Sequence, residues 1–200
     1  MNFAVFASGN GTNLQAIIDA IKKKVIRGAN LSLVVSDNPK AYALKRAVRA
    51  KIKSVVIDPK EFSAREDFDR EVERHLEMEK IDFIVLAGFM RILSPYFIER
   101  YHHRILNIHP TLLPAFKGAH AIRDTFQYGV KVTGVTVHLV DDKVDHGPII
   151  LQESLKINSA DTLATLEKKI HRIEHKIYPK AINLFSCGRL KIAGRKVKII

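Results

Sequence analysis

The stretch with the clearest chemical potential is Asn107-Ile108-His109-Pro110, at the end of an otherwise apolar run. Residues two apart point to the same face of a strand, so Asn107 and His109 are expected to project together. Pro110 disfavours a helical conformation at His109 and keeps it extended. An amide can donate to a developing oxyanion, and an imidazole can donate or accept a proton near neutral pH. The pair therefore suits acyl transfer, with a buried Asn/His pair that satisfies backbone groups as the alternative.

A second polar stretch, Asp145-His146-Gly147-Pro148, closes a loop in the last third of the chain. A carboxylate placed near His109 would orient the imidazole, stabilise its cation and raise its pKa. Asp141 and Asp142 crowd the same turn, so spacing alone favours a solvated loop aspartate at position 145.

The segment Ser8–Asn13 (SGNGTN) is a glycine loop between an apolar run and a helical pattern. Its two glycines let the backbone approach a ligand, and free N–H groups at a helix start attract an anion. Leu14 stands where a dinucleotide fingerprint has its third glycine, and no GK[ST] follows, although Asp37 keeps dinucleotide binding open. We predict phosphate binding here, and the alternative is a tight turn capped by Thr12 or Asn13.

The elements that must position these residues follow a β-α alternation in the first half of the chain. Short runs rich in Val, Ile, Leu or Phe and without polar alternation, typical of buried parallel strands, cover residues 3–7, 31–35, 54–57, 83–87 and 105–109, with helices expected over 12–26, 40–51, 62–79 and 94–102. Further on we expect a helix at 120–128, strands at 132–140 and 148–157, a helix at 160–186 kinked at Pro179, and a hairpin around 193–194. The pattern predicts an α/β fold: an open, mostly parallel, Rossmann-like twisted sheet with helices on both faces.

Composition narrows the class of protein. The chain has 200 residues, 46% of them hydrophobic, which suits one domain with a sizeable core and excludes disorder. The single cysteine excludes an internal disulfide framework and a cysteine-based zinc site. No apolar run approaches the ~20 residues of a membrane span, so we expect a soluble cytoplasmic protein. The net charge of +12 indicates an anionic partner without saying which.

Taken together, the motifs resemble the folate-dependent formyltransferases, and most closely the members that act on glycinamide ribonucleotide in purine synthesis. The resemblance covers nearly the whole chain in family order, and its segments are FASGNGTN (6–13), GFMRILSP (88–95), RILNIHPTLLPAFKG (104–118), GVTVHLVDDKVDHGPIILQ (134–152) and EHKIYPKAI (174–182). The chain departs from the family pattern at His146, where members often carry glycine.

The resemblance implies a formyltransferase fold over residues 1–200, with phosphate and ribonucleotide bound by the amino-terminal half and folate by the carboxyl-terminal half. It implies formyl transfer from 10-formyltetrahydrofolate as co-substrate, without a metal. The implied catalytic residues are Asn107, His109 and Asp145. Substrate contacts are implied for Gly11, Thr12, Asn13 and Glu174, and folate contacts for Arg65, Met90, Arg91, Ile92, Leu93, Arg104, Asn107, Val140, Asp141 and Asp145. Helix spacing puts Glu174 at the edge of the core-facing stripe, although an exposed ion pair would also fit.

Several alternatives stay open at this point. Methionyl-tRNA formyltransferases share the three catalytic residues, but they generally append a domain for which the 14 residues after Ser186 leave no room. Deformylase relatives usually carry an extra amino-terminal domain, for which the residues before the glycine loop leave no room either. A basic nucleic-acid-binding module would rest on the cationic tail alone, and we do not expect nucleic acid as a partner. His171 and His175 have i, i+4 spacing but no HExxH motif, and we place them on the outer side of their helix rather than at a metal. We expect small-molecule substrates, no membrane, and a monomer or homodimer.

Overall fold

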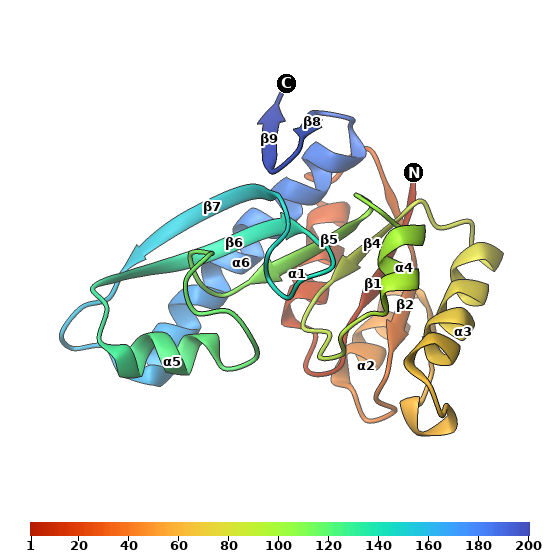
Figure 1. Ribbon diagram of the computed structural model, residues 1–200, viewed down its shortest axis with the longest axis horizontal. Helices are drawn as coiled ribbons and strands as arrows, with labels where there is room; N and C mark the ends of the chain where they lie inside the picture. Colours follow the sequence, from red (N-terminus) through yellow and green to blue (C-terminus); the bar gives the residue numbers. More distant parts are fainter.

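One continuous sheet of nine strands runs through the computed structural model, which describes residues 1–200 (Figure 1). The strands are β1 (Asn2–Phe6), β2 (Asn30–Ser36), β3 (Lys53–Val56), β4 (Phe83–Leu86), β5 (Ile105–His109), β6 (Val132–Leu139), β7 (Ile149–Lys156), β8 (Leu190–Ala193) and β9 (Lys196–Ile199), in the spatial order β3-β2-β1-β4-β5-β6-β7-β9-β8. Neighbours among β1–β5 are parallel, which confirms the expected mostly parallel α/β sheet. The order reverses at β1, and ligands bind at such switch points beyond the carboxyl ends of the strands.

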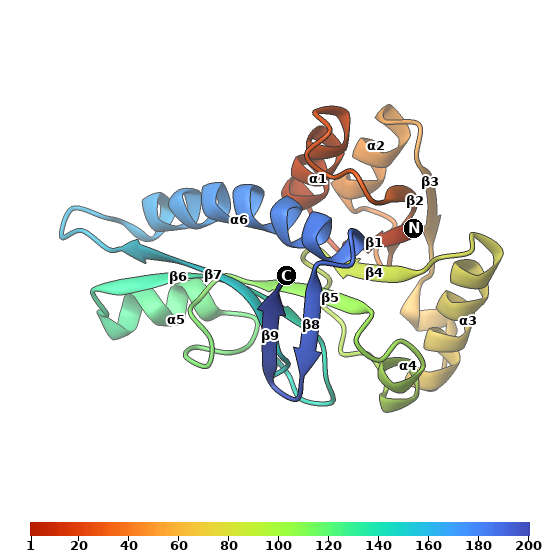
Figure 2. The same cartoon turned by 90° about the horizontal axis from the view of Figure 1, so that it is seen from above.

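Helices cover both faces of the sheet (Figure 2). The helices α1 (Thr12–Lys22), α2 (Tyr42–Arg49) and α6 (Leu163–Ser186) lie on one face, and α3 (Arg65–Met78) and α4 (Pro95–Arg100) lie on the other. Two separate buried clusters result. The first lies between the sheet and α1, α2 and α6, and the second lies between the sheet and α3 and α4. The fully buried strands β1 and β4 contribute alternate side chains to both clusters, which is why their sequences show no polar alternation.

The direction of the chain changes after β5. Strand β6 runs antiparallel to β5, with Asn107 opposite His138 and His109 opposite Thr136, and β7 is antiparallel to β6. The turn between β6 and β7 therefore brings Asp145 back toward the side chains of β5. Helix α5 (Ala121–Tyr128) packs with α6 against the first cluster.

All of the expected helices and strands are present, and the differences lie mostly at their ends. Helix α1 stops at Lys22 rather than residue 26, because Lys24 adopts φ 57 and the N–H of Val25 turns back to the carbonyl of Ala20. A short 3-10 helix at Pro59–Glu61 was not expected, and it is capped by the side chain of Asp58. Helix α6 continues through Pro179 to Ser186. None of the helices combines the length and apolar composition needed to cross a lipid bilayer.

Candidate functional site

The structure brings the three predicted catalytic residues together. The carboxylate of Asp145 lies 3.3 Å from His109 Nδ1 through Oδ2, and 3.4 Å from Asn107 Nδ2 through Oδ1. The predicted alternation of β5 places Asn107 and His109 on one face, and the β6–β7 turn supplies Asp145. His109 is buried, with 4% of its surface exposed, so solvent screens these contacts little. A neutral amide donor, an imidazole and a carboxylate thus face one point at the centre of the sheet.

A fourth member of this cluster, His138, did not emerge from the sequence. Its Nδ1 donates to the carbonyl of Leu139 at 2.7 Å, which leaves Nε2 to accept from Asn107 Nδ2 at 3.1 Å. Both N–H bonds of the Asn107 amide are then directed at acceptors, His138 and Asp145, and the amide orientation is fixed. Only the antiparallel register of β5 and β6 reveals this pairing, because 31 residues separate the two in the chain.

Burial lowers the pKa of His109 overall, although Asp145 acts to raise it, as expected. This effect of burial on the pKa outweighs the opposing effects of the Asp145 charge and of the Phe116 carbonyl. The ring still has an oxygen at each nitrogen: Nε2 donates to the carbonyl of Phe116 at 2.8 Å, and Nδ1 faces Asp145. The imidazole is therefore held mainly neutral near pH 7, with its Nδ1 as an acceptor beside a carboxylate.

Asp145 is held ionised in this cluster. Burial acts to raise its pKa, but His138, a 2.8 Å hydrogen bond from the Gly118 N–H and the charge of His109 together hold the pKa below its usual range. Its backbone has φ 48, a left-handed conformation that is rare for a residue with a side chain. The expectation of a solvated loop aspartate is replaced by a partly buried carboxylate with four polar neighbours.

The glycine loop follows β1 and opens α1 without a side-chain cap. Gly11 occupies the N-cap position at φ 71, and neither Thr12 nor Asn13 caps the helix, contrary to the alternative interpretation. The first N–H groups of α1 are thus free for an anion, which the helix dipole also favours. The loop is tied to the segment after β4, because the Ser8 hydroxyl accepts from the N–H of Met90 at 3.0 Å.

Replacement of Gly11 by alanine is expected to destabilise this loop. A Cβ on Gly11 would lie 2.8 Å from Ala43 Cβ and 2.9 Å from its Cα, and the positive φ adds strain. We expect Gly11→Ala to lower the free energy of unfolding by about 1–3 kcal/mol, measured by urea denaturation. Gly9→Ala is the matched control, because a Cβ there meets nothing within 4 Å. Equal stability of the two variants would contradict the close approach of α2 to the loop.

Glu174 is buried, not an exposed ion-pair partner, and it reaches the glycine loop from α6. It accepts from Asn13 Nδ2 at 3.0 Å and from His171 Nδ1 at 2.8 Å. His171 is exposed, as its placement on the outer side of α6 implies, although its ring reaches Glu174; the placement of His175 there is wrong, because it is only partly exposed and lies beside α1. The hydrogen bond to Glu174 raises the pKa of His171.

Removal of the Glu174 charge should be visible at His171. The hydrogen-bonded carboxylate favours the imidazolium, so Glu174→Gln should return the pKa of His171 toward its usual value. The stabilisation given by the pair is complete below the ordinary histidine pKa and is lost as pH rises through the raised value. The measurement is an NMR titration of His171, with His120, for which no partner is found, as the reference ring. An unchanged His171 titration in the variant would exclude the ion pair.

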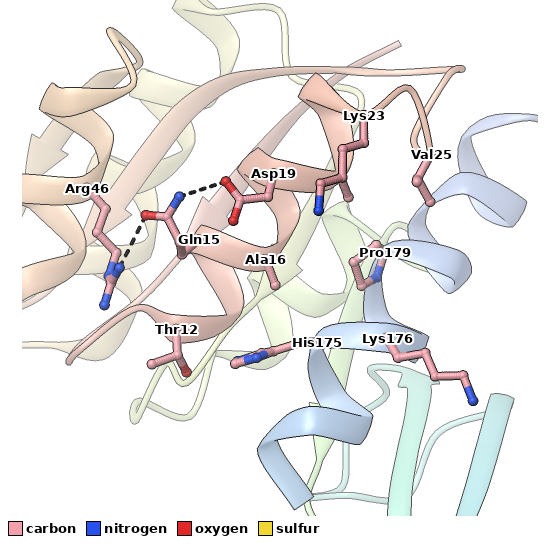
Figure 3. A pocket seen from close by; sticks show the side chains of 11 residues that line it. Thr12, Gln15, Ala16, Asp19, Lys23, Val25, Arg46, His175, Lys176 and Pro179 are labelled. Carbon is pink, nitrogen blue, oxygen red and sulfur yellow. Dashed lines mark hydrogen bonds between the residues drawn. The ribbon is translucent and has the colours of Figure 1, made fainter. Parts of the chain in front are cut away.

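A groove of about 560 Å³ runs between α1 and α6, from Thr12 and His175 toward Val25 (Figure 3). It does not include Asn107, His109 or Asp145. Arg46 of α2, which the sequence did not single out, lies at its edge and holds the glycine loop: Nε donates to the Asn10 carbonyl and Nη2 to the Asn10 side chain, both at 2.9 Å. Its Nη1 also donates to Gln15 on α1 (Figure 3).

The residues predicted to contact folate gather on the face of the sheet covered by α3 and α4. Leu93 and Val140 both pack with the second buried cluster, although they follow different strands. Met90 and Ile92, in the same segment as Leu93, are 67% and 59% exposed. Asp141 starts the loop that ends in Gly147 and accepts from His146 Nδ1 at 2.7 Å. These segments form an exposed apolar edge next to the polar cluster.

The three arginines predicted near this edge have different surroundings. The Arg91 guanidinium lies 4.6 Å above the Phe68 ring, and its Nε is buried without a partner. Arg65 begins α3. Arg104 precedes β5, where it donates to the carbonyl of Arg100 at 2.6 Å and lies over the Tyr101 ring. Arg91 is therefore the one of the three with a buried nitrogen that lacks a hydrogen-bond partner.

A family model, curated proteins and solved structures that resemble this chain all point to formyltransferases. The family model described as "Formyl transferase" matches residues 1–182. The phosphoribosylglycinamide formyltransferase of Bacillus subtilis is 43% identical over 90% of this chain and 92% of its own. The trifunctional purine biosynthetic protein adenosine-3 of Gallus gallus is 44% identical over 94% of this chain, which spans 19% of that larger protein. The crystal structure of glycinamide ribonucleotide transformylase 1 from Symbiobacterium toebii superposes with a TM-score of 0.97 at 44% identity, covering 100% of this chain and 94% of that one.

Proposed function

The chain belongs to the formyl transferase family, and from this we propose that it transfers a formyl group from 10-formyltetrahydrofolate to the amine of glycinamide ribonucleotide in purine biosynthesis. The observation that carries the proposal is the convergence of Asn107, His109 and Asp145 at the centre of the sheet. An uncapped helix start and an apolar edge flank this centre, so an anionic acceptor and an aromatic donor can approach it from two sides.

The acceptor would bind through its phosphate and ribose. The free N–H groups of Gly11, Thr12 and Asn13 suit a phosphate at the start of α1. Glu174, already bonded to Asn13, has a carboxylate suited to the hydroxyl groups of a ribose. His171 adds positive charge next to this site when it is protonated, and Arg46 keeps the loop in place.

The folate donor would bind at the apolar edge. Met90 and Ile92 offer exposed apolar surface for a flat pterin ring, while Leu93 is buried and Val140 partly buried in the adjoining core. The acidic tail of the folate would meet Arg91, whose Nε lacks a partner, with Arg65 and Arg104 as further cations. In this arrangement residues 1–200 act as one formyltransferase domain, with the acceptor held mainly by the amino-terminal half and the donor mainly by the carboxyl-terminal half.

Asn107 is assigned to the formyl oxygen. As the acceptor amine forms a bond to the formyl carbon, negative charge develops on that oxygen, and the charge needs a donor in a site shielded from water. One N–H of Asn107 is held by His138 at 3.1 Å, and the other makes the longer, 3.4 Å contact with Asp145. Release of this longer contact frees an N–H for the formyl oxygen while His138 keeps the amide oriented.

His109 and Asp145 are assigned to the proton. The new bond joins the acceptor nitrogen to the formyl carbon, the bond from that carbon to the folate nitrogen breaks, and one proton must pass between the two nitrogens. The mainly neutral His109 can accept this proton at Nδ1 and pass it on, because Asp145 at 3.3 Å stabilises the imidazolium formed meanwhile.

The test is a comparison of acceptors with 10-formyltetrahydrofolate as donor. We expect formylated glycinamide ribonucleotide as the product and no formylation of methionyl-tRNA under the same conditions. Formylation of methionyl-tRNA alone would overturn the choice of acceptor, and the absence of both reactions in a preparation that binds donor would overturn the function.

A further inference from the structure

The carboxyl-terminal hairpin β8–β9 reaches the loop that carries Asp145. Its turn residue Arg195 donates from Nη2 to the backbone carbonyl of His146 at 2.7 Å, and its Nη1 lies against the His146 ring, 3.1 Å from Nε2 and 3.2 Å from Nδ1. The hairpin is anchored next to the loop exit, because β9 pairs with β7 at Lys196 and Ile149. Two groups of one guanidinium therefore hold both the backbone and the ring of one loop residue.

His146 also contacts Asp141, at the start of the same loop. Its Nδ1 donates to Asp141 Oδ2 at 2.7 Å, while Arg195 Nη1 contacts the same ring. The chain of contacts from Arg195 through His146 to Asp141 braces the loop between its two ends. A glycine at position 146 would retain only the contact at the backbone carbonyl, so the brace depends on the His146 side chain.

The braced residue is the direct neighbour of Asp145. The carbonyl bonded to Arg195 lies one peptide unit after Asp145, whose backbone holds the uncommon φ of 48. Gly147 on the other side is packed so closely against the carbonyl of Leu139 that no Cβ would fit. The position of Asp145 relative to His109 thus depends on how firmly the short segment between these residues is held.

We propose that Arg195 is a positioning residue, which fixes the loop at residues 141–147 through His146 and thereby holds Asp145 in place for proton transfer. This inference rests on the proposed function for its kinetic consequence, but the ordering of the loop can be measured without it. Arg195 touches neither of the reacting groups, so its contribution should appear in the turnover rate and not in the binding of the acceptor.

The experiment compares Arg195→Ala with Lys198→Ala, which removes a cation from the same hairpin where no side-chain contact is found. Backbone ¹⁵N order parameters of residues 143–147 should fall in Arg195→Ala from about 0.85 toward 0.6, and remain unchanged in the control. The loss of these hydrogen bonds should lower kcat about 5- to 30-fold, with an unchanged KM for the ribonucleotide. Arg195→Lys, which can keep the carbonyl contact, should recover part of the loss.

A double-mutant comparison separates the brace from general damage to the hairpin. In a His146→Gly background, Arg195→Ala should cost less in kcat than in the native chain, because one of the two contacts is already absent. Order parameters and kcat that match the Lys198→Ala control would overturn the proposal. If the native chain shows no formyl transfer, the proposed function fails, while the order parameters still decide whether Arg195 holds the loop.

Discussion

Replacement of Asp145 by asparagine is expected to lower kcat by about 100- to 10,000-fold, the usual range for loss of acid–base catalysis. The asparagine side chain has nearly the same shape, and its oxygen can still accept from the Gly118 N–H. The loss is therefore electrostatic: a protonated His109 would no longer face a carboxylate at 3.3 Å. The measurement is kcat at saturating donor and acceptor, and a near-normal kcat would contradict the assigned role.

The same variant should move the pKa of His109 in a defined direction. The Asp145 charge acts to raise this pKa against the dominant effect of burial, so its removal should lower the pKa further. Binding of the ribonucleotide should change little, because the phosphate and ribose contacts lie elsewhere. Asp142→Asn is the matched control: it removes the same charge from the same loop, at an exposed residue with no partner, and should leave kcat within about twofold.

Replacement of Asn107 by alanine is expected to lower kcat by about 100- to 1,000-fold, as found when one oxyanion donor is removed. The second N–H of this amide is the one directed toward Asp145, and it is the donor assigned to the formyl oxygen. The affinity for the donor should fall much less than kcat, because the charge on the formyl oxygen develops only during the reaction.

The effect of Asn107→Ala on stability can be separated from its effect on kcat. Asn107→Ala leaves His138 Nε2 without its donor, so some stability should be lost as well. Asn107→Asp keeps the size but removes both N–H donors, and it should reduce kcat at least as strongly as alanine does. Steady-state kinetics and thermal unfolding of both variants give the comparison. A kcat within about threefold of the native value in either variant would contradict oxyanion stabilisation by Asn107.

The polar pair on β5 could be predicted from the sequence because it depends on local geometry. Alternation along a strand places Asn107 and His109 on one face, and the following proline keeps His109 extended. Asp145 could not be predicted in this way, because 36 residues and an antiparallel turn separate it from His109, and only the family resemblance singled it out. His138 was missed for the same reason, since its partner is set by the register between β5 and β6.

The surroundings of most charged and titratable residues could not be predicted from the sequence. Burial, which spacing does not reveal, lowers the pKa of His109 overall and outweighs the raising effect expected of Asp145. Arg46 and Arg195 look like ordinary surface cations, yet each contacts a functional loop from a distant element. Helix spacing made a buried Glu174 plausible, but its charge by itself favoured an exposed ion pair, and only the family resemblance singled it out.

The fate of the formyl carbon tests the central claim most directly. A single-turnover reaction with ¹³C-labelled formyl donor and glycinamide ribonucleotide can be followed by NMR until the donor is consumed. We expect all of the label on the amine nitrogen of the ribonucleotide, with none released as formate. Label that appears as free formate, or remains on the folate while both substrates are bound, would contradict formyl transfer by this cluster.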